Sequence, residues 1–272
     1  MYSSHHHKHH ARRLLCLTAL LCFAAGGTAY ACTRKAAVPQ LPQLPAESLE
    51  LPAENGAQQS TLTAAQAQAI LDDPRMILVS RTHPITEDYP VETKECGSAT
   101  AINKTLQTEA ANAFLSMQAA AAKDGVDVRM QSGYRSVSYQ KKLYNDKTQY
   151  YRNKGLSEAA AREKAAAIVN PPGYSEHNCG LAADLNSPEH TTLDTGFADT
   201  AAFRWLCENA EQYGFILRYP KEAESVTGIT YEPWHWRYVG PENAALLNQS
   251  GLCLEDAVAV LQRIAAGETV TG

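Results

Sequence analysis

The chain has 272 residues, of which 44% are hydrophobic and 19% are charged. These proportions are ordinary for a soluble globular protein, and one folded domain is the simplest expectation. Acidic side chains outnumber basic ones by 29 to 24, which excludes a strongly basic protein, so we expect no nucleic-acid partner.

The amino terminus has the layout of a secretory signal peptide. Lys8, Arg12 and Arg13 precede an apolar run at 14–25, which small residues follow. The run has 12 residues, whereas a membrane-spanning helix needs about 20, so a cleaved signal is favoured over an uncleaved anchor. We therefore expect residues 1–31 to be a signal peptide and the protein to be extracytoplasmic, either secreted or associated with the membrane or cell wall.

Cys32 directly follows the predicted cleavage site and is a candidate for the lipid-bearing cysteine of a bacterial lipoprotein. Tyr30 is bulky where such signals carry small residues, so membrane attachment through Cys32 and a secreted form without a lipid are alternatives. Residues 32–60 contain four prolines and no helical apolar period, which is typical of an extended tether; a leader without a role is the alternative. The folded domain is expected at 61–272.

The pattern of apolar residues predicts the elements of this domain in chain order. They are a helix at 63–72, a buried strand at 76–80, a helix from about Leu106 that Gly125 ends, a half-buried strand at 126–130, helices at 138–153 and 157–169, a helix that Thr200 caps and Gly214 ends, a strand in "FILRYP", and a helix pair at 241–265. Strands separated by helical hairpins, without a Gly-rich phosphate loop, favour an α+β domain over a doubly wound parallel sheet.

Two histidines and one aspartate are candidates for a metal site. His177 and Asp184 lie in "SEHNCGLAAD", and His235 lies in "EPWHWR". Two histidines plus a carboxylate suit a catalytic Zn²⁺ ion, because three protein ligands leave the fourth position to a water molecule that the metal makes acidic. His83 and His190 have no partners at ligand spacing and are expected to be structural.

The water molecule at such a site needs a base, and Glu232 is the candidate. It stands three residues before His235, a spacing that would send the two side chains to opposite faces of a regular strand. Pro233 between them predicts a bend instead, which allows both to face the metal. A solvated loop acid is the alternative for Glu232.

Three motifs resemble those of the VanY-type D-Ala-D-Ala carboxypeptidases. They are "SGYRS" at 132–136, "SEHNCGLAAD" at 175–184 and "EPWHWR" at 232–237, in the order of the family. The similarity extends from about residue 77 to residue 240. This family is a branch of the zinc peptidases that also includes lysostaphin-like enzymes and the hedgehog amino-terminal domain.

The resemblance implies that His177, Asp184 and His235 bind Zn²⁺ and that Glu232 polarises the attacking water. It implies an α+β fold in which a small, mainly antiparallel sheet packed with helices carries the zinc site. The implied activity is removal of the terminal D-Ala from peptidoglycan stem peptides, with D,D- or L,D-specificity, by a protein that we expect to be a monomer. A peptidoglycan endopeptidase and a non-catalytic peptidoglycan-binding domain are the alternatives.

The resemblance also assigns three further residues. Arg135 matches the family arginine near the oxyanion, and its alternative is a surface salt bridge. Gln140 and Ser175 match positions that line the substrate pocket, and their alternative is to cap or line turns. Four cysteines of the domain can form disulfides in an exported protein, and we assign no pairing among them. They are Cys96, Cys179, Cys207 and Cys253.

Overall fold

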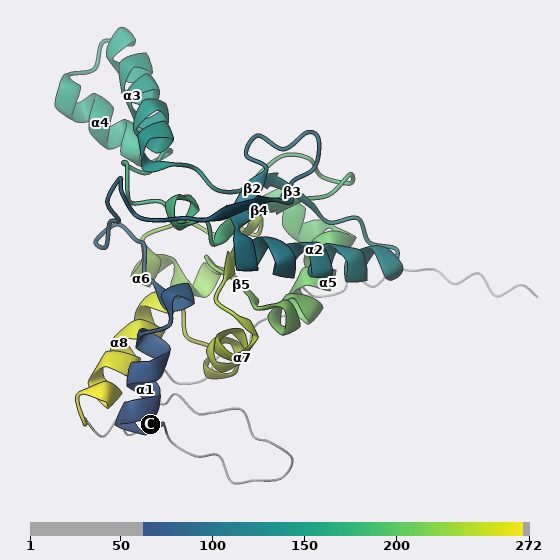
Figure 1. Cartoon of the computed structure of the whole chain (residues 1–272). Coiled ribbons are helices and arrows are strands. Elements are labelled where there is room, and N and C mark those ends of the chain that lie inside the picture. Colours follow the sequence, from purple (N-terminus) through teal and green to yellow (C-terminus); the bar gives the residue numbers. More distant parts are fainter. Residues whose placement is uncertain (1–61, 269–272) are drawn as a thin grey trace, which may run out of the picture. The chain divides into compact units, whose positions relative to one another are not determined.

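The computed structural model of the chain describes residues 62–268 (Figure 1). The predicted signal peptide (1–31) and tether (32–60) lie outside this range and stay predictions. Among the described residues, no single helix is long and apolar enough to cross a membrane, and only α7 (Pro241–Ser250) with α8 (Leu254–Ala265), bent by 95°, pass that test as a pair.

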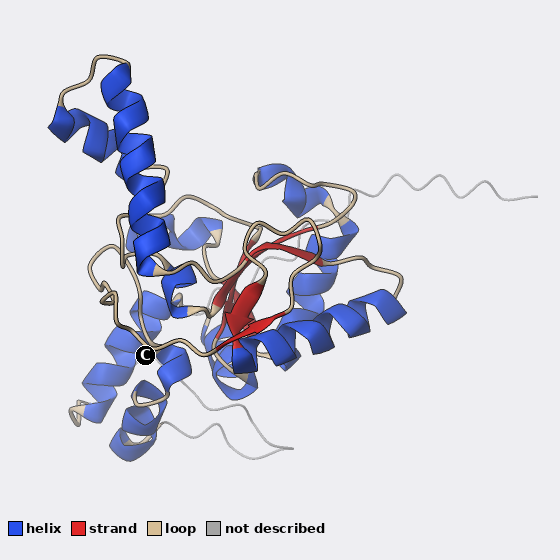
Figure 2. Cartoon of the chain, turned by 45° about the horizontal axis from the view of Figure 1, so that its top comes forward, coloured by secondary structure: helices blue, strands red, loops and turns tan. Residues whose placement is uncertain are grey.

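A four-stranded antiparallel sheet forms the centre of the domain (Figure 2). Its strands, in spatial order, are β3 (Arg129–Ser132), β4 (Ala182–Asn186), β6 (His235–Tyr238) and β5 (Phe215–Leu217). A separate antiparallel pair, which the sequence pattern did not predict, joins β1 (Thr93–Glu95) to β2 (Thr105–Gln107). The expected α+β class with a small antiparallel sheet is confirmed.

The two faces of the sheet differ in character because side chains alternate along each strand. On one face, Leu185 of β4 and Trp236 of β6 join a buried core with α2 (Thr108–Lys123) and α5 (Ala201–Asn209). The ring of Trp236 lies 6.3 Å from that of Phe203 in α5. The opposite face is left for the polar side chains of the candidate site.

A second buried core joins α1 (Ala64–Leu71) to α7 and α8. A capping box begins α1, because the Thr63 hydroxyl accepts the backbone N–H of Gln66 and the Gln66 side chain accepts that of Thr63. The expected helix at 63–72 and the expected pair at 241–265 are therefore confirmed.

The remaining helices connect these two cores or project from them. The helices α3 (Val137–Asn153) and α4 (Glu158–Ala166) form a hairpin. The Thr200 hydroxyl caps α5 as expected by accepting the Phe203 N–H at 3.1 Å. The other helical segments are α6 (Glu224–Thr227) and the 3-10 helices η1 (Pro74–Met76), η2 (Glu176–Cys179), η3 (Thr195–Asp199), η4 (Ala210–Tyr213) and η5 (Lys221–Ala223).

The predicted strand at 76–80 is wrong. Its first residue belongs to η1, and the others pair with no strand within 62–268. The carbonyls of Arg75 and Ile77 instead accept hydrogen bonds from the guanidinium of Arg237, at 2.9 and 2.7 Å. A buried side chain thus satisfies backbone groups that a neighbouring strand would otherwise satisfy.

Two predicted boundaries also shift. The strand expected at 126–130 begins only at Arg129, because the N–H of Val126 and the carbonyl of Val128 bond to α2 rather than to the sheet. The helix expected at 157–169 ends at Ala166.

Candidate metal centre and active-site cleft

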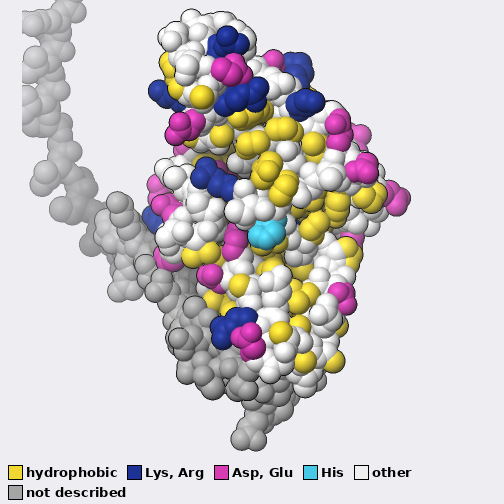
Figure 3. Space-filling view, turned by 90° about the vertical axis from the view of Figure 1, so that its left-hand side faces the viewer, with side chains coloured by type: hydrophobic (Ala, Val, Ile, Leu, Met, Phe, Trp, Pro, Cys, Tyr) yellow, Lys and Arg dark blue, Asp and Glu magenta, His cyan; other side chains and the backbone are white. Residues whose placement is uncertain are grey.

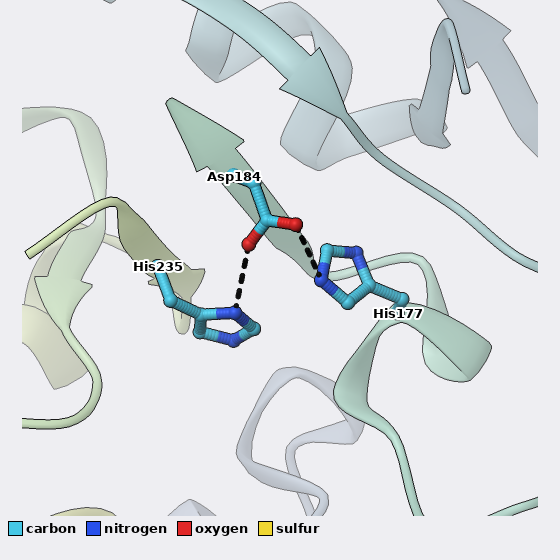
Figure 4. Close-up of side chains that lie close together, drawn as sticks. All are labelled: His177, Asp184 and His235. Carbon is cyan, nitrogen blue, oxygen red and sulfur yellow. Dashed lines mark hydrogen bonds and ion pairs between the residues drawn. The ribbon is translucent and has the colours of Figure 1, made fainter. Parts of the chain in front are cut away.

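The antiparallel register of β4 and β6 builds the metal centre. It places Asp184 directly opposite His235, so both side chains leave the same face of the sheet. His177 arrives from η2, which precedes β4. The ligand atoms of the three residues lie within 4.8 Å of one another, and Figure 4 shows both imidazole rings turned toward the Asp184 carboxylate.

The small residues of the "SEHNCGLAAD" motif allow η2 to approach the sheet closely. Gly180 ends η2 with a φ of +75°, a backbone conformation that favours glycine. A Cβ atom there would lie 2.8 Å from Val91 Cγ1 and 3.0 Å from the backbone nitrogen of Gln107. The glycine therefore permits the turn that brings His177 beside Asp184.

Each histidine is oriented by a hydrogen bond on the ring nitrogen that faces away from the site. Nδ1 of His177 lies 2.8 Å from the carbonyl oxygen of Gly133, which can only accept, so Nδ1 donates and Nε2 remains free as a ligand atom. Nε2 of His235 lies 3.3 Å from a Glu176 carboxylate oxygen, which leaves Nδ1 of His235 for the metal. These two ligand atoms lie 3.2 and 3.1 Å from the oxygens of Asp184.

This donor set fits a zinc ion. Two imidazole nitrogens and a carboxylate are typical ligands of catalytic zinc, and the outward hydrogen bonds from the rings are the orienting contacts that such sites use. All three side chains are buried, with 3%, 10% and 6% of the side chain exposed for His177, Asp184 and His235. The site can therefore hold the metal in a partly desolvated position at the floor of the cleft.

The ionisation of the three residues follows from their surroundings. Burial and the nearby Arg135 lower the pKa of His177, which favours the neutral ring that a metal requires. Burial alone would raise the pKa of Asp184, but the two histidines hold it below its ordinary value. Burial opposes the charge on His235 as well, yet its bonds to Asp184 and Glu176 raise its pKa to about 9. Because a metal binds the neutral ring, it competes at His235 with the proton that these bonds favour.

The Glu176 carboxylate is fully buried among charged groups, which makes it different from the other glutamates near the site. Its Oε1 accepts hydrogen bonds from Arg218 and Arg237, both at 2.7 Å. Arg218 in turn pairs with Glu255 of α8 at 2.7 and 2.8 Å. Although burial acts in the opposite direction, the two arginines hold the pKa of Glu176 well below its ordinary value. We call these four residues the Glu176 cluster.

Glu232 and His235 lie at the two ends of a tight turn. The His235 N–H donates to the Glu232 carbonyl at 3.1 Å, and the Trp236 indole donates to the carbonyl of Pro233 at 3.0 Å. The turn confirms the predicted bend and brings a Glu232 carboxylate oxygen to 3.8 Å from Nδ1 of His235. Burial raises the pKa of Glu232 to about 7, and a cation bound beside it would lower that pKa.

The metal centre opens into a cleft of about 520 Å³. Arg135 lines it, and its buried Nε has no hydrogen-bond partner among the described residues. Arg81 also lines the cleft, and none of the acids in 62–268 lies within ion-pair distance of it. Unpaired buried donors are rare in proteins, so the free Nε of Arg135 indicates a place for a ligand oxygen.

Gln140 and Ser175 also line the cleft, as the resemblance implied. The Gln140 Nε2 donates to the Asn170 carbonyl at 2.6 Å, which ties α3 to the segment that follows α4. Its Oε1 is buried without a partner among residues 62–268, so it is an acceptor available to a ligand. Gln140 thus has a structural bond through Nε2 and an unpartnered Oε1, and its binding of substrate stays a prediction.

All seven residues singled out from the sequence line this one cleft, and their roles there stay predictions. His83 and His190 lie elsewhere, in hydrogen bonds with neighbouring hydroxyls and with Asp194. Cys179 is a buried thiol that donates to the Glu176 carbonyl, and it does not belong to the metal group. The four cysteines of the described range are free.

Sequence reasoning missed Arg81, Glu176 and Arg218. The signal for Glu176 was an acid inside a motif of small and apolar residues, whereas nothing local marks Arg218.

Comparisons with known proteins agree with this geometry. The family model described as VanY, D-alanyl-D-alanine carboxypeptidase, matches residues 103–241. A D-alanyl-D-alanine carboxypeptidase of Enterococcus faecalis (strain ATCC 700802 / V583) is 36% identical over 225 residues, which cover 80% of this chain and 78% of that protein.

Two solved structures are also similar. One is a mutant of the vancomycin-resistance D,D-pentapeptidase VanY from a VanB-type cassette in complex with Zn(II), with 36% identity, a TM-score of 0.56, and coverage of 68% of this chain and 99% of that one. The other is the LD-carboxypeptidase LdcB, with 29% identity, a TM-score of 0.59, and coverage of 81% and 98%.

We predict that Glu176→Gln weakens zinc binding by about 10- to 100-fold, because the variant loses the charged acceptor that orients His235. It should also lower the free energy of unfolding by about 3–5 kcal/mol, since Arg218 and Arg237 keep their buried charges without this partner. Chelator competition measures the first effect, and urea unfolding measures the second.

The matched control is Asp194→Asn, which removes an exposed carboxylate that lies 2.8 Å from a histidine. It should leave zinc affinity unchanged and lower the free energy of unfolding by less than about 1 kcal/mol. Wild-type zinc affinity and stability in Glu176→Gln would show that Glu176 does not position the metal centre.

Proposed function

The chain belongs to the VanY family of D-alanyl-D-alanine carboxypeptidases, and we propose that it removes the terminal D-Ala from peptidoglycan stem peptides with a zinc ion as its cofactor. The observation that carries the proposal is the buried set of His177, Asp184 and His235 with the Glu232 carboxylate 3.8 Å from Nδ1 of His235. The zinc complex of the similar VanY pentapeptidase supports the choice of metal.

Zinc, when bound, would make a water molecule acidic and polarise a peptide carbonyl. The half-buried Glu232 is placed to accept a proton from the attacking water and to return it to the leaving amine of D-Ala. Arg135, with its unpartnered Nε, is placed to donate to the oxygen on which negative charge develops. The guanidinium of Arg135 would also attract the terminal carboxylate of the bound substrate before the reaction begins.

A carboxypeptidase must recognise a free carboxylate at the end of its substrate. Arg81 and Arg135 are the arginines that line the cleft in the described part of the chain, and Ser175 adds a hydroxyl. This cationic lining supports trimming of a terminal residue over cleavage inside a cross-bridge. The acid at position 232 supports turnover over simple binding, because a binding domain has no need of a base.

We assign D,D-specificity, so that the bond cleaved joins two D-Ala residues of a pentapeptide stem. The support is the family match and the 36% identity with proteins named for that activity. L,D-specificity is the second candidate, because the structure of the LD-carboxypeptidase LdcB covers 81% of this chain, whereas that of the VanY D,D-pentapeptidase covers 68%. The proposal places the protein outside the cytoplasm, where this substrate lies, in line with the predicted signal peptide.

We predict that Glu232→Gln retains zinc and the fold but loses about 10²- to 10⁴-fold in turnover, because an amide has the size of the carboxylate but cannot take the proton. The measurement is steady-state release of D-Ala, with zinc content determined for each preparation. The control is Glu222→Gln, an exposed acid on η5 outside the cleft lining, which should keep the wild-type rate. Near-normal turnover by a zinc-loaded Glu232→Gln protein would remove Glu232 as the base.

Product analysis on two synthetic stems tests the assigned specificity. The purified protein should release one D-Ala from L-Ala-γ-D-Glu-L-Lys-D-Ala-D-Ala and leave the corresponding tetrapeptide intact. Release from the tetrapeptide alone would establish the L,D alternative. Release from neither stem, with muropeptides still bound, would contradict the proposed activity and favour a binding domain.

A further inference from the structure

The hairpin of α3 and α4 stands away from the sheet (Figures 1 and 2). Its helices hold each other through buried side chains, among them Tyr144, whose hydroxyl donates to the Arg162 carbonyl at 3.2 Å. The outer faces of both helices carry exposed polar residues. The hairpin therefore presents a surface that the packing of the domain does not require.

This surface has a charge opposite to that of the rest of the chain. Residues 137–166 contain seven basic and three acidic side chains, a formal charge of +4. The remaining residues contain 17 basic and 26 acidic side chains, a formal charge of −9. Figure 3 shows Lys and Arg side chains over the hairpin, which lies at the top of that view. Such an asymmetry attracts anionic partners to the hairpin specifically.

Three lysines of the hairpin lie over tyrosine rings instead of pairing with acids. The ammonium groups of Lys147 and Lys154 lie 5.5 and 5.0 Å from the ring centre of Tyr150, and that of Lys164 lies 5.7 Å from the ring centre of Tyr151. No carboxylate in residues 62–268 lies within 4.0 Å of these three lysines. Contact with an aromatic face leaves the ammonium N–H groups free for an anionic ligand.

The same hairpin forms one wall of the catalytic cleft. Gln140 of α3 and residues 166–170, at and beyond the end of α4, line the cleft. Ile168 in that segment is 60% exposed at the rim. The base of the hairpin therefore adjoins the cleft in which the proposed substrate would bind.

We infer that the α3–α4 hairpin is a second binding surface for peptidoglycan, used when the substrate is the polymer and not a free peptide. This inference rests on the proposed function, which places a stem peptide in the adjacent cleft. The ammonium groups of Lys147, Lys154 and Lys164 pair with carboxylates of neighbouring stems. Two linked contacts raise the affinity for the polymer without changing the cleft.

The test compares a polymeric and a soluble substrate. The triple variant Lys147→Gln, Lys154→Gln, Lys164→Gln should bind insoluble peptidoglycan, freed of proteins and phosphodiester polymers, about tenfold more weakly in cosedimentation at low salt, as three weak ion pairs together would give. Release of D-Ala from that material should fall in parallel. The kcat/KM on the soluble pentapeptide should stay at the wild-type value, and 0.5 M NaCl should abolish most of the difference in binding, since salt screens exposed charges.

The matched control removes the same charge elsewhere, by Lys94→Gln, Lys104→Gln and Lys123→Gln on β1, before β2 and at the end of α2. It should bind and cleave like the wild type. Equal binding by the two triple variants would overturn the inference, as would a difference that appears only on material that retains phosphodiester polymers. An inactive wild-type protein on the soluble peptide would contradict the proposed function, whereas the cosedimentation comparison reports on the hairpin independently.

Discussion

Two buried arginines, Arg218 and Arg237, donate hydrogen bonds to the single carboxylate of Glu176, and the position of the metal centre depends on this interaction. Burying such charges is costly unless each has a partner and good hydrogen bonds. Here both arginines bond to Oε1 at 2.7 Å, which leaves the second oxygen of Glu176 for Nε2 of His235. The ring of His235 is thus held by a carboxylate that cannot move without leaving Arg237 with no carboxylate partner and Arg218 with Glu255 alone.

The Glu176 cluster also connects distant parts of the chain. Arg218 follows β5, Arg237 belongs to β6, and Glu255 lies in α8, which packs in the second core. Arg237 additionally bonds two carbonyls near η1. Metal ligands that must hold a fixed geometry need such support from rigid elements. The apolar face of the sheet also holds β4 and β6 rigidly, because its side chains pack in the first core. The polar face of the same strands lines the cleft.

Residue chemistry and motif spacing predicted much of the site from the sequence. His177, Asp184 and His235 come together as expected. The prediction was possible because the domain has few histidines, and two histidines with one carboxylate are a typical ligand set for catalytic zinc. The turn between Glu232 and His235 was predicted from Pro233 alone. Helices with clear caps and apolar periods, such as α1 and α5, were also placed well.

The errors arise where a distant side chain decides the local structure. The run at 76–80 has the composition of a strand, yet Arg237, far along the chain, donates to the carbonyl of Ile77 and to that of Arg75 just before the run. Glu176 was passed over for the same reason, since its partners lie 42 and 61 residues away. Short strands such as β1, with three exposed residues, carry no apolar pattern to detect.

Anomalous diffraction at the zinc absorption edge, on crystals of the zinc-loaded domain, tests the central claim most directly. We expect one zinc peak per chain at about 2.0–2.2 Å from Nε2 of His177, Nδ1 of His235 and an Asp184 oxygen, with Nε2 of His235 still bonded to Glu176. A zinc ion held by Nε2 of His235, by Cys179, or by residues outside the cleft would contradict it.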